Sequence, residues 1–165
     1  MKIKKTIIVL LLCFLPVASS FAQKVGEALS AWKEGYMDIH HINTGCGECA
    51  YIIFPDGTTM LVDAGENKAD NSRHVLPKPN AGRTPGEWIV DYIQAMAPDQ
   101  NQQLDYALIT HFHSDHMGGV FKTKNESGRY YNTGIITVAE NIRINKLVDR
   151  GFPDYKFLVN TEDKM

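Results

Sequence analysis

The sequence is poor in the features that define several specialised classes of protein. Only three cysteines occur among 165 residues, which excludes a disulfide-rich scaffold. A formal net charge of −2 provides no basic surface for tight binding of nucleic acid. Glycine and proline, at 13 and 7 residues, are too few for a collagen-like or low-complexity chain. These absences leave one globular domain of common size.

Long hydrophobic runs are missing except near the start of the chain. Residues 6–17 are almost wholly apolar, follow three lysines and precede a segment of small residues that ends at Ala22. This pattern is typical of a signal peptide, and the run is shorter than the roughly 20 residues that a membrane-spanning helix needs. We therefore expect residues 1–22 to be removed on export and residues 23–165 to form a periplasmic or secreted domain.

The charge of the exported domain limits its partners. Cleavage would remove three lysines and no acidic residue, so the net charge would change from −2 to −5. An acidic protein does not attract long nucleic acids or anionic lipids through its overall field. We therefore expect a small-molecule substrate, and no stable membrane insertion once the signal peptide is gone.

The alternation of apolar residues predicts an antiparallel meander in the first half of the chain. A Pro-Asp-Gly turn at residues 55–57 separates two segments rich in apolar and β-branched residues. Strands are expected at residues 37–44, 49–54 and 58–63.

A helix start follows the polar loop at residues 64–83. Thr84 can cap the helix, Pro85 suits the first helical position and Glu87 completes a capping box. An apolar stripe at helical spacing then continues until Pro98 stops the helix. Further along the chain we expect a strand at 104–110, a short helix at 135–140 and a strand or mixed segment at 141–149.

Three histidines and an aspartate lie within six residues, directly after the predicted strand 104–110. His111 and His113 are two residues apart, so their side chains point to the same side of an extended backbone. Asp115 and His116 follow on a turn that lets them reach a second point nearby. Imidazole nitrogens and a carboxylate oxygen suit zinc, and would also accept iron or manganese. The spacing therefore predicts a metal site.

The run His-x-His-x-Asp-His that begins at His111, followed by two glycines, resembles the signature of the metallo-β-lactamase superfamily. The sequence Asp-Ala-Gly from Asp63 is similar to the Asp-x-Gly motif that precedes the metal motif in that family. Residues 45–48 resemble the Gly-x-Gly-Asp opening of the branch related to the hydrolase domain of bacterial DNA-uptake proteins. Here Cys46 and Glu48 replace the usual Gln and Asp.

The resemblance implies an α/β fold, the αββα sandwich, with metals at one edge. By matched position, His111 and His113 would bind a first zinc ion, while Asp115 and His116 would bind a second. Asp63 would lie behind these ligands and orient an imidazole. Asp115 would also act in catalysis by orienting a water that attacks an ester, a phosphodiester or a related substrate.

Features of the complete family are missing after His116. The family has a further histidine, a bridging aspartate and a final histidine, whereas this chain has no histidine beyond His116. Our hypothesis is that the chain is the N-terminal half of the sandwich, which the coding sequence downstream of Met165 would test. The alternative function is a metal-binding or interaction module without catalysis. His40, His41 and His74 could be recruited to the site, although strand and loop histidines are more often structural.

Cys46 and Cys49 remain after export and allow three interpretations. They could form a local disulfide in an oxidising compartment or a redox-active pair. The interpretation that the sequence favours is two small residues packed around a tight turn at Gly47.

Overall fold

The computed structural model describes residues 26–66, 80, 82–98, 103–119, 128–130, 132–151, 153 and 155. The predicted signal peptide and most of the loop at 64–83 lie outside this part of the chain. The chain divides into two units, residues 1–30 and 31–165. All elements below belong to the second unit. Within the described ranges no helix is both long and apolar enough to cross a bilayer.

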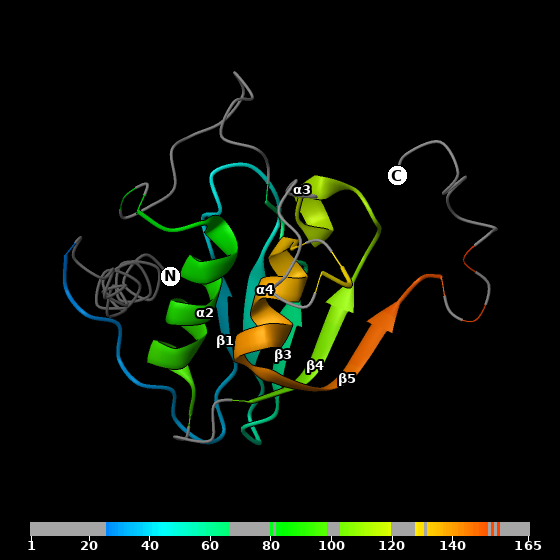
Figure 1. The fold of residues 1–165 in the computed structure, drawn as a ribbon. Coiled ribbons are helices and arrows are strands. Elements are labelled where there is room, and N and C mark those ends of the chain that lie inside the picture. The colour runs from blue at the N-terminus through cyan, green and yellow to red at the C-terminus, as the bar shows by residue number, and fades with distance from the viewer. Residues whose placement is uncertain are drawn as a thin grey trace, which may run out of the picture. The chain divides into compact units, whose positions relative to one another are not determined.

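Five strands form one mixed sheet in the order β1-β2-β3-β4-β5 (Figure 1). Their bounds are Asp38–His41, Ala50–Ile53, Thr59–Val62, Gln103–Ile109 and Arg143–Asp149. Strands β1, β2 and β3 are antiparallel, which confirms the predicted meander, and β3, β4 and β5 run parallel. The segment that was predicted as strand or mixed is a strand from Arg143 onward.

The helices α2, α3 and α4 span Pro85–Met96, Ser114–Met117 and Gly134–Asn141. The capping box predicted for α2 is confirmed. The backbone N–H of Glu87 donates to Thr84 Oγ1 at 3.3 Å, and the Glu87 carboxylate accepts from the Thr84 backbone at 2.7 Å. The predicted short helix at 135–140 is also present as α4, which Thr133 caps.

Helices α2 and α4 cover the same face of the sheet (Figure 1). Each follows a strand and leads to the next parallel strand, and right-handed crossovers in one direction place both helices on one side. The two helices contact each other. The fully buried core between the helices and the sheet includes Tyr51, Ile53, Leu61, Ile89, Ile93 and Val138.

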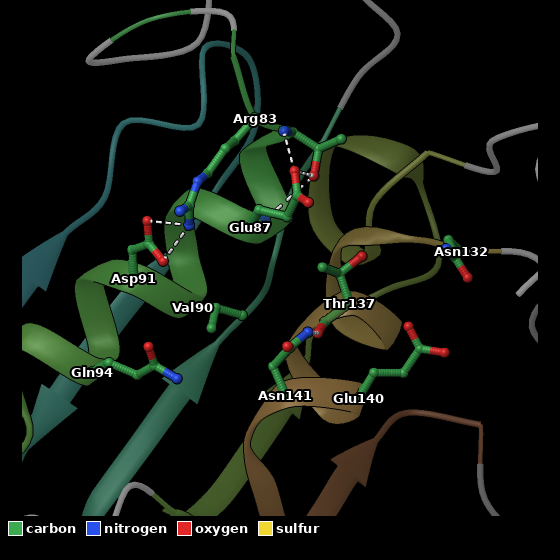
Figure 2. A pocket seen from close by; sticks show the side chains of 10 residues that line it. Arg83, Glu87, Val90, Asp91, Gln94, Asn132, Thr137, Glu140 and Asn141 are labelled. Atoms are coloured by element: carbon green, nitrogen blue, oxygen red, sulfur yellow. Dashed lines mark hydrogen bonds and ion pairs between the residues drawn. The ribbon is translucent and has the colours of Figure 1, made fainter. Parts of the chain in front are cut away.

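The seam between α2 and α4 opens to the surface as a polar groove of about 410 Å³ (Figure 2). The charged groups in its wall already have partners. Arg83 pairs with Asp91 at 2.6 Å, Glu87 belongs to the capping box, and Glu140 accepts from the Tyr130 hydroxyl at 2.9 Å. The charged side chains that line the groove are therefore paired without a ligand, each within one helix and the segment before it.

The opposite face of the sheet carries an apolar row that crosses four strands. Ile39, Ile52, Met60 and Tyr106 are successive cross-strand partners, and they alternate with the buried core residues along their strands. Ile39 is 54% exposed and Tyr106 is 36% exposed. In the expected sandwich a second sheet covers the helix-free face. The described residues form an α/β fold with one sheet and contain no second sheet.

Candidate metal centre

The metal motif lies where two parallel strands end side by side. Strand β3 ends at Val62 and β4 at Ile109, so the residues that follow them emerge at the same edge of the sheet. The backbone N–H of Asp63 donates to the Leu108 carbonyl at 2.8 Å, which places Asp63 beside Thr110. Figure 1 shows the short helix α3 at this edge.

Asp63 is held in a single position by its backbone and by its carboxylate. The side chain is only 1% exposed. Its Oδ1 accepts from the Thr110 backbone N–H at 2.8 Å and its Oδ2 accepts from the Thr110 hydroxyl at 2.7 Å. The residue has a φ of 59°, a left-handed conformation that aspartate tolerates better than most residues. The carboxylate is therefore fixed beneath the histidine cluster.

His116 completes the hydrogen bonding of this carboxylate. Its Nδ1 lies 2.8 Å from Asp63 Oδ2, a distance at which a protonated Nδ1 donates to the carboxylate. The other ring nitrogen, Nε2, is then left with a lone pair for a metal ion. Nε2 faces the Asp115 carboxylate, 3.9 Å from its Oδ2. Asp63 thus lies where its carboxylate can orient the His116 imidazole.

The remaining predicted ligands converge on the same point. Donor atoms of His111, His113 and Asp115 all lie within 4.8 Å of one another. The His111 ring lies 4.8 Å from the His113 ring and 3.8 Å from the His116 ring, measured between centroids. Burial, together with the nearby rings of His116 and His113, lowers the pKa of His111 below 6.5. A lowered pKa favours the neutral imidazole, which is the form that binds metals.

This donor set fits a bound metal ion. Two atoms that bind one zinc ion at about 2.1 Å each lie at most about 4.2 Å apart, so the three side chains need only small rotations to close on one ion. Packed without a metal, imidazoles this close would repel one another once protonated. The structure therefore has a His111/His113/Asp115 site that can hold a metal, with His116 at its border.

Thr110 is part of the site, although its role was not predicted from the sequence. Its hydroxyl donates to Asp63 and lies 3.2 Å from Nδ1 of His111 and 3.3 Å from Nδ1 of His116. One hydroxyl thus links the orienting carboxylate to both imidazoles. The sequence offered one signal for Thr110: it is the polar residue directly before the motif, at the end of an apolar strand.

Glu66 is a second residue that the sequence did not reveal. It is fully buried, and among the described residues neither carboxylate oxygen has a hydrogen-bond partner. Burial, with a smaller contribution from the charge of Glu87, raises the pKa of Glu66 to about 7, although the nearby Gly86 backbone amide lowers it slightly. Its backbone N–H donates to the Ser114 carbonyl at 2.9 Å, so it lies directly behind the metal motif. A glutamate in a polar loop gives no sequence signal of burial.

Two of the other histidines occupy structural positions. His40 contacts the Tyr92 hydroxyl through Nδ1 at 3.0 Å, and burial lowers its pKa against the opposing charge of Asp38. His41 is exposed and lies 3.6 Å from a Glu48 carboxylate oxygen. Among the described residues, the group that can hold a metal includes neither histidine. His74 lies outside the described residues.

Cys46 and Cys49 are not joined by a disulfide in the structure. Cys49 is 2% exposed and belongs to the core cluster. Burial, assisted by the charges of Glu48 and Asp63, raises the pKa of the Cys49 thiol, which keeps it in its unreactive protonated form. The geometry favours the packing interpretation over redox chemistry.

A model of the metallo-beta-lactamase superfamily matches residues 43–128, which is more than half of the chain. The protein therefore belongs to the metallo-β-lactamase superfamily, and this membership indicates a metal-dependent hydrolase. The matched region includes the whole histidine motif and Asp63. No curated protein and no solved structure matches the chain.

Proposed function

We propose that the protein is an exported metallo-hydrolase that directs a metal-activated water onto an ester, a phosphodiester or a related bond of a small molecule. The observation that carries this proposal is the convergence of His111, His113 and Asp115, with His116 held by a buried carboxylate. Superfamily membership supports the reaction class. Export rests on the signal-peptide pattern of residues 1–22.

The proposed site would hold two metal ions. His111 and His113 would bind the first, and Asp115 and His116 the second. The Asp115 donor atom lies within 4.8 Å of those of His111 and His113, so this carboxylate is close to both ligand pairs. The nitrogen and oxygen donors favour zinc, with iron or manganese as alternatives. Bound metals of this kind lower the pKa of water towards 7 and polarise the oxygen of the substrate.

The residues of the chain have separate tasks in this proposal. Asp63 holds the proton on Nδ1 of His116 and so keeps Nε2 available as a ligand. The Asp115 side chain is 48% exposed, so its carboxylate can accept a hydrogen bond from the attacking water and aim it at the substrate. Thr110 donates to both carboxylate oxygens of Asp63, through its backbone N–H and its hydroxyl, which limits rotation of the carboxylate.

Zinc stoichiometry and hydrolysis of bis-p-nitrophenyl phosphate test the proposal on the full chain. We expect the wild type to bind zinc and to hydrolyse the ester, and His113→Ala to abolish turnover because a ligand is lost. His41→Ala is the matched control, since it removes an exposed strand histidine outside the cluster. Turnover that is unchanged in His113→Ala would rule out the metal-dependent mechanism.

The second candidate is a metal-binding or interaction module without catalysis. The exposed apolar row from Ile39 to Tyr106 favours it, because such rows mark surfaces that bind other protein segments. Stoichiometric zinc binding without hydrolysis of any ester tested would support this candidate over the enzyme.

A further inference from the structure

Three backbone hydrogen bonds hold the short helix α3 from outside. A helix of four residues leaves nearly all of its carbonyl groups without partners inside the helix. In this structure three successive carbonyls, from the middle of the metal motif, each accept from a loop amide. The pairs are Glu66 N to Ser114 O at 2.9 Å, Glu48 N to Asp115 O at 2.8 Å and Ala64 N to His116 O at 2.7 Å.

The donors come from two loops that are themselves bonded together. One loop, residues 45–48, precedes β2, and the other, residues 63–66, follows β3. The Gly65 amide donates to the Glu48 carbonyl at 2.9 Å. The two loops therefore form one clamp around the backbone of Asp115, and we use the name clamp for residues 45–48 and 63–66 below.

Two glycines allow this close approach. A Cβ atom added at Gly47 would lie 2.5 Å from the Asp115 carbonyl oxygen, and one added at Gly65 would overlap the same oxygen. Cβ atoms do not approach other atoms so closely, so any larger residue forces the loop and α3 apart. Gly47 also has a φ of 139°, which favours glycine. Gly65 has no such backbone requirement, so its lack of a side chain serves the close contacts within the clamp, with the Asp115 carbonyl and with the Glu48 amide nitrogen, which an added Cβ would approach to 2.9 Å.

The clamp acts on one half of the ligand set. Asp115 and His116 belong to α3, whose carbonyls it holds. His111 precedes α3, and His113 is the residue before its first turn. The clamp hydrogen bonds given above reach neither of these two histidines.

We propose that Gly47 and Gly65 are positioning residues that set the affinity of the Asp115/His116 half of the site separately from the His111/His113 half. This inference rests on the proposed two-metal function. By letting the loops close on the carbonyl of Asp115, the glycines fix the backbone from which both second-metal ligands project. Widening the clamp displaces those two ligands most directly, because its hydrogen bonds end on the backbone of α3. His113 should move less, since it is joined to α3 only at the helix start, where its carbonyl accepts from the His116 and Met117 amides at 3.0 and 2.9 Å.

A pair of glycine variants separates this role from ordinary backbone strain. Gly47→Ala adds a methyl group against Asp115 at a φ of 139°, whereas Gly35→Ala adds one at another positive φ, 86°, with no atom within 4 Å. Both carry the cost of a positive φ, and only the first presses on the clamp. Zinc affinity is measured for each by competition with a chelator, and folding by far-ultraviolet circular dichroism.

We expect Gly47→Ala to weaken binding of one zinc ion by about 10- to 100-fold, the usual effect of disturbing the support of a ligand. Binding of the other ion should weaken much less, and Gly35→Ala should resemble the wild type for both. Equal weakening of both ions, or wild-type affinity in Gly47→Ala, would overturn the inference. A wild type that binds no zinc would overturn the proposed function as well.

Amide hydrogen exchange of the metal-free wild type provides a readout that needs neither metal nor a variant. We expect the Glu48 and Ala64 amides to be protected, because both donate within the clamp. Exchange at the rate of exposed amides would show that the clamp is open and would overturn the inference, even if Gly47→Ala failed to fold.

Discussion

Two regions of this domain depart from the usual burial of residues in opposite ways. One is the edge of the sheet where β3 and β4 end, and the other is the face of the sheet that no helix covers. At the edge, Asp63 and Glu66 are almost completely buried. On the face, Ile39 and Tyr106 are 54% and 36% exposed. Buried carboxylates and exposed apolar rows are the two informative exceptions to normal burial.

The difference shows that each region is shaped for a different contact. Burying a carboxylate is costly unless hydrogen bonds or a cation compensate for it, and Asp63 is compensated by Thr110 and His116. The exposed row has the apolar character of a surface that packs against another sheet. The edge is thus suited to charged groups such as Asp63, and the face is suited to apolar packing.

Removing the buried carboxylate at the edge should produce the largest effect on stability. Asp63→Ala leaves the Thr110 amide and hydroxyl without their acceptor and places alanine at a φ of 59°. We expect the free energy of unfolding of the metal-free protein to fall by about 3–5 kcal/mol, as when one partner of a buried pair is removed. Urea titration measures it. Asp91→Ala, which removes the partially exposed ion pair with Arg83, should cost about 1 kcal/mol or less. Equal losses in the two variants would contradict a structural role for Asp63.

The two faces of the sheet can be compared with one substitution on each. Leu61 is completely buried against the helices, so Leu61→Ala should cost about 2–5 kcal/mol of unfolding free energy. Ile39→Ala, on the exposed row, should cost about 1 kcal/mol or less, because surface changes have small effects. Thermal or urea unfolding of both variants checks the difference. A cost at Ile39 as large as that at Leu61 would show that the helix-free face is covered in solution.

The features of the fold and the site that the sequence predicts are those whose residues lie close together in the chain. The capping box of Thr84 and Glu87 spans four residues, and the histidine motif spans six, so both could be read directly from the chain. Asp63 lies far from the motif in sequence and was identified through the family resemblance. The tight turn at Gly47 was also recognised, but its contact with Asp115 depends on how two distant loops meet.

Burial of Glu66 shows why the parts of the site that depend on contacts between distant segments could not be predicted from the sequence. Its surroundings are the start of α2 and the motif loop at Ser114, which meet only after the sheet has formed. A polar loop residue in the sequence therefore becomes a core residue in the fold.

Glu66 provides a third predicted stability effect, which depends on pH. A carboxyl group whose pKa rises from 4.5 in the unfolded chain to about 7 in the fold stabilises the fold below pH 4.5. That stability is lost as the pH rises from 4.5 to about 7, because over this range the unfolded chain releases the proton that the buried group still holds. Glu66→Gln removes the titration, so we expect the variant to be more stable than the wild type at pH 8 by about 3 kcal/mol.

At pH 4.5 the same two proteins should differ little, because the wild-type carboxyl group is then mostly neutral and resembles the amide. Urea titrations of the metal-free proteins at both pH values measure the difference. Glu140→Gln is the matched control, since Glu140 is exposed on α4. A Glu66→Gln variant that is less stable than the wild type at pH 8 would mean that the buried carboxylate is ionised and compensated in the fold. The edge would then bind charge at Glu66 as well as at Asp63.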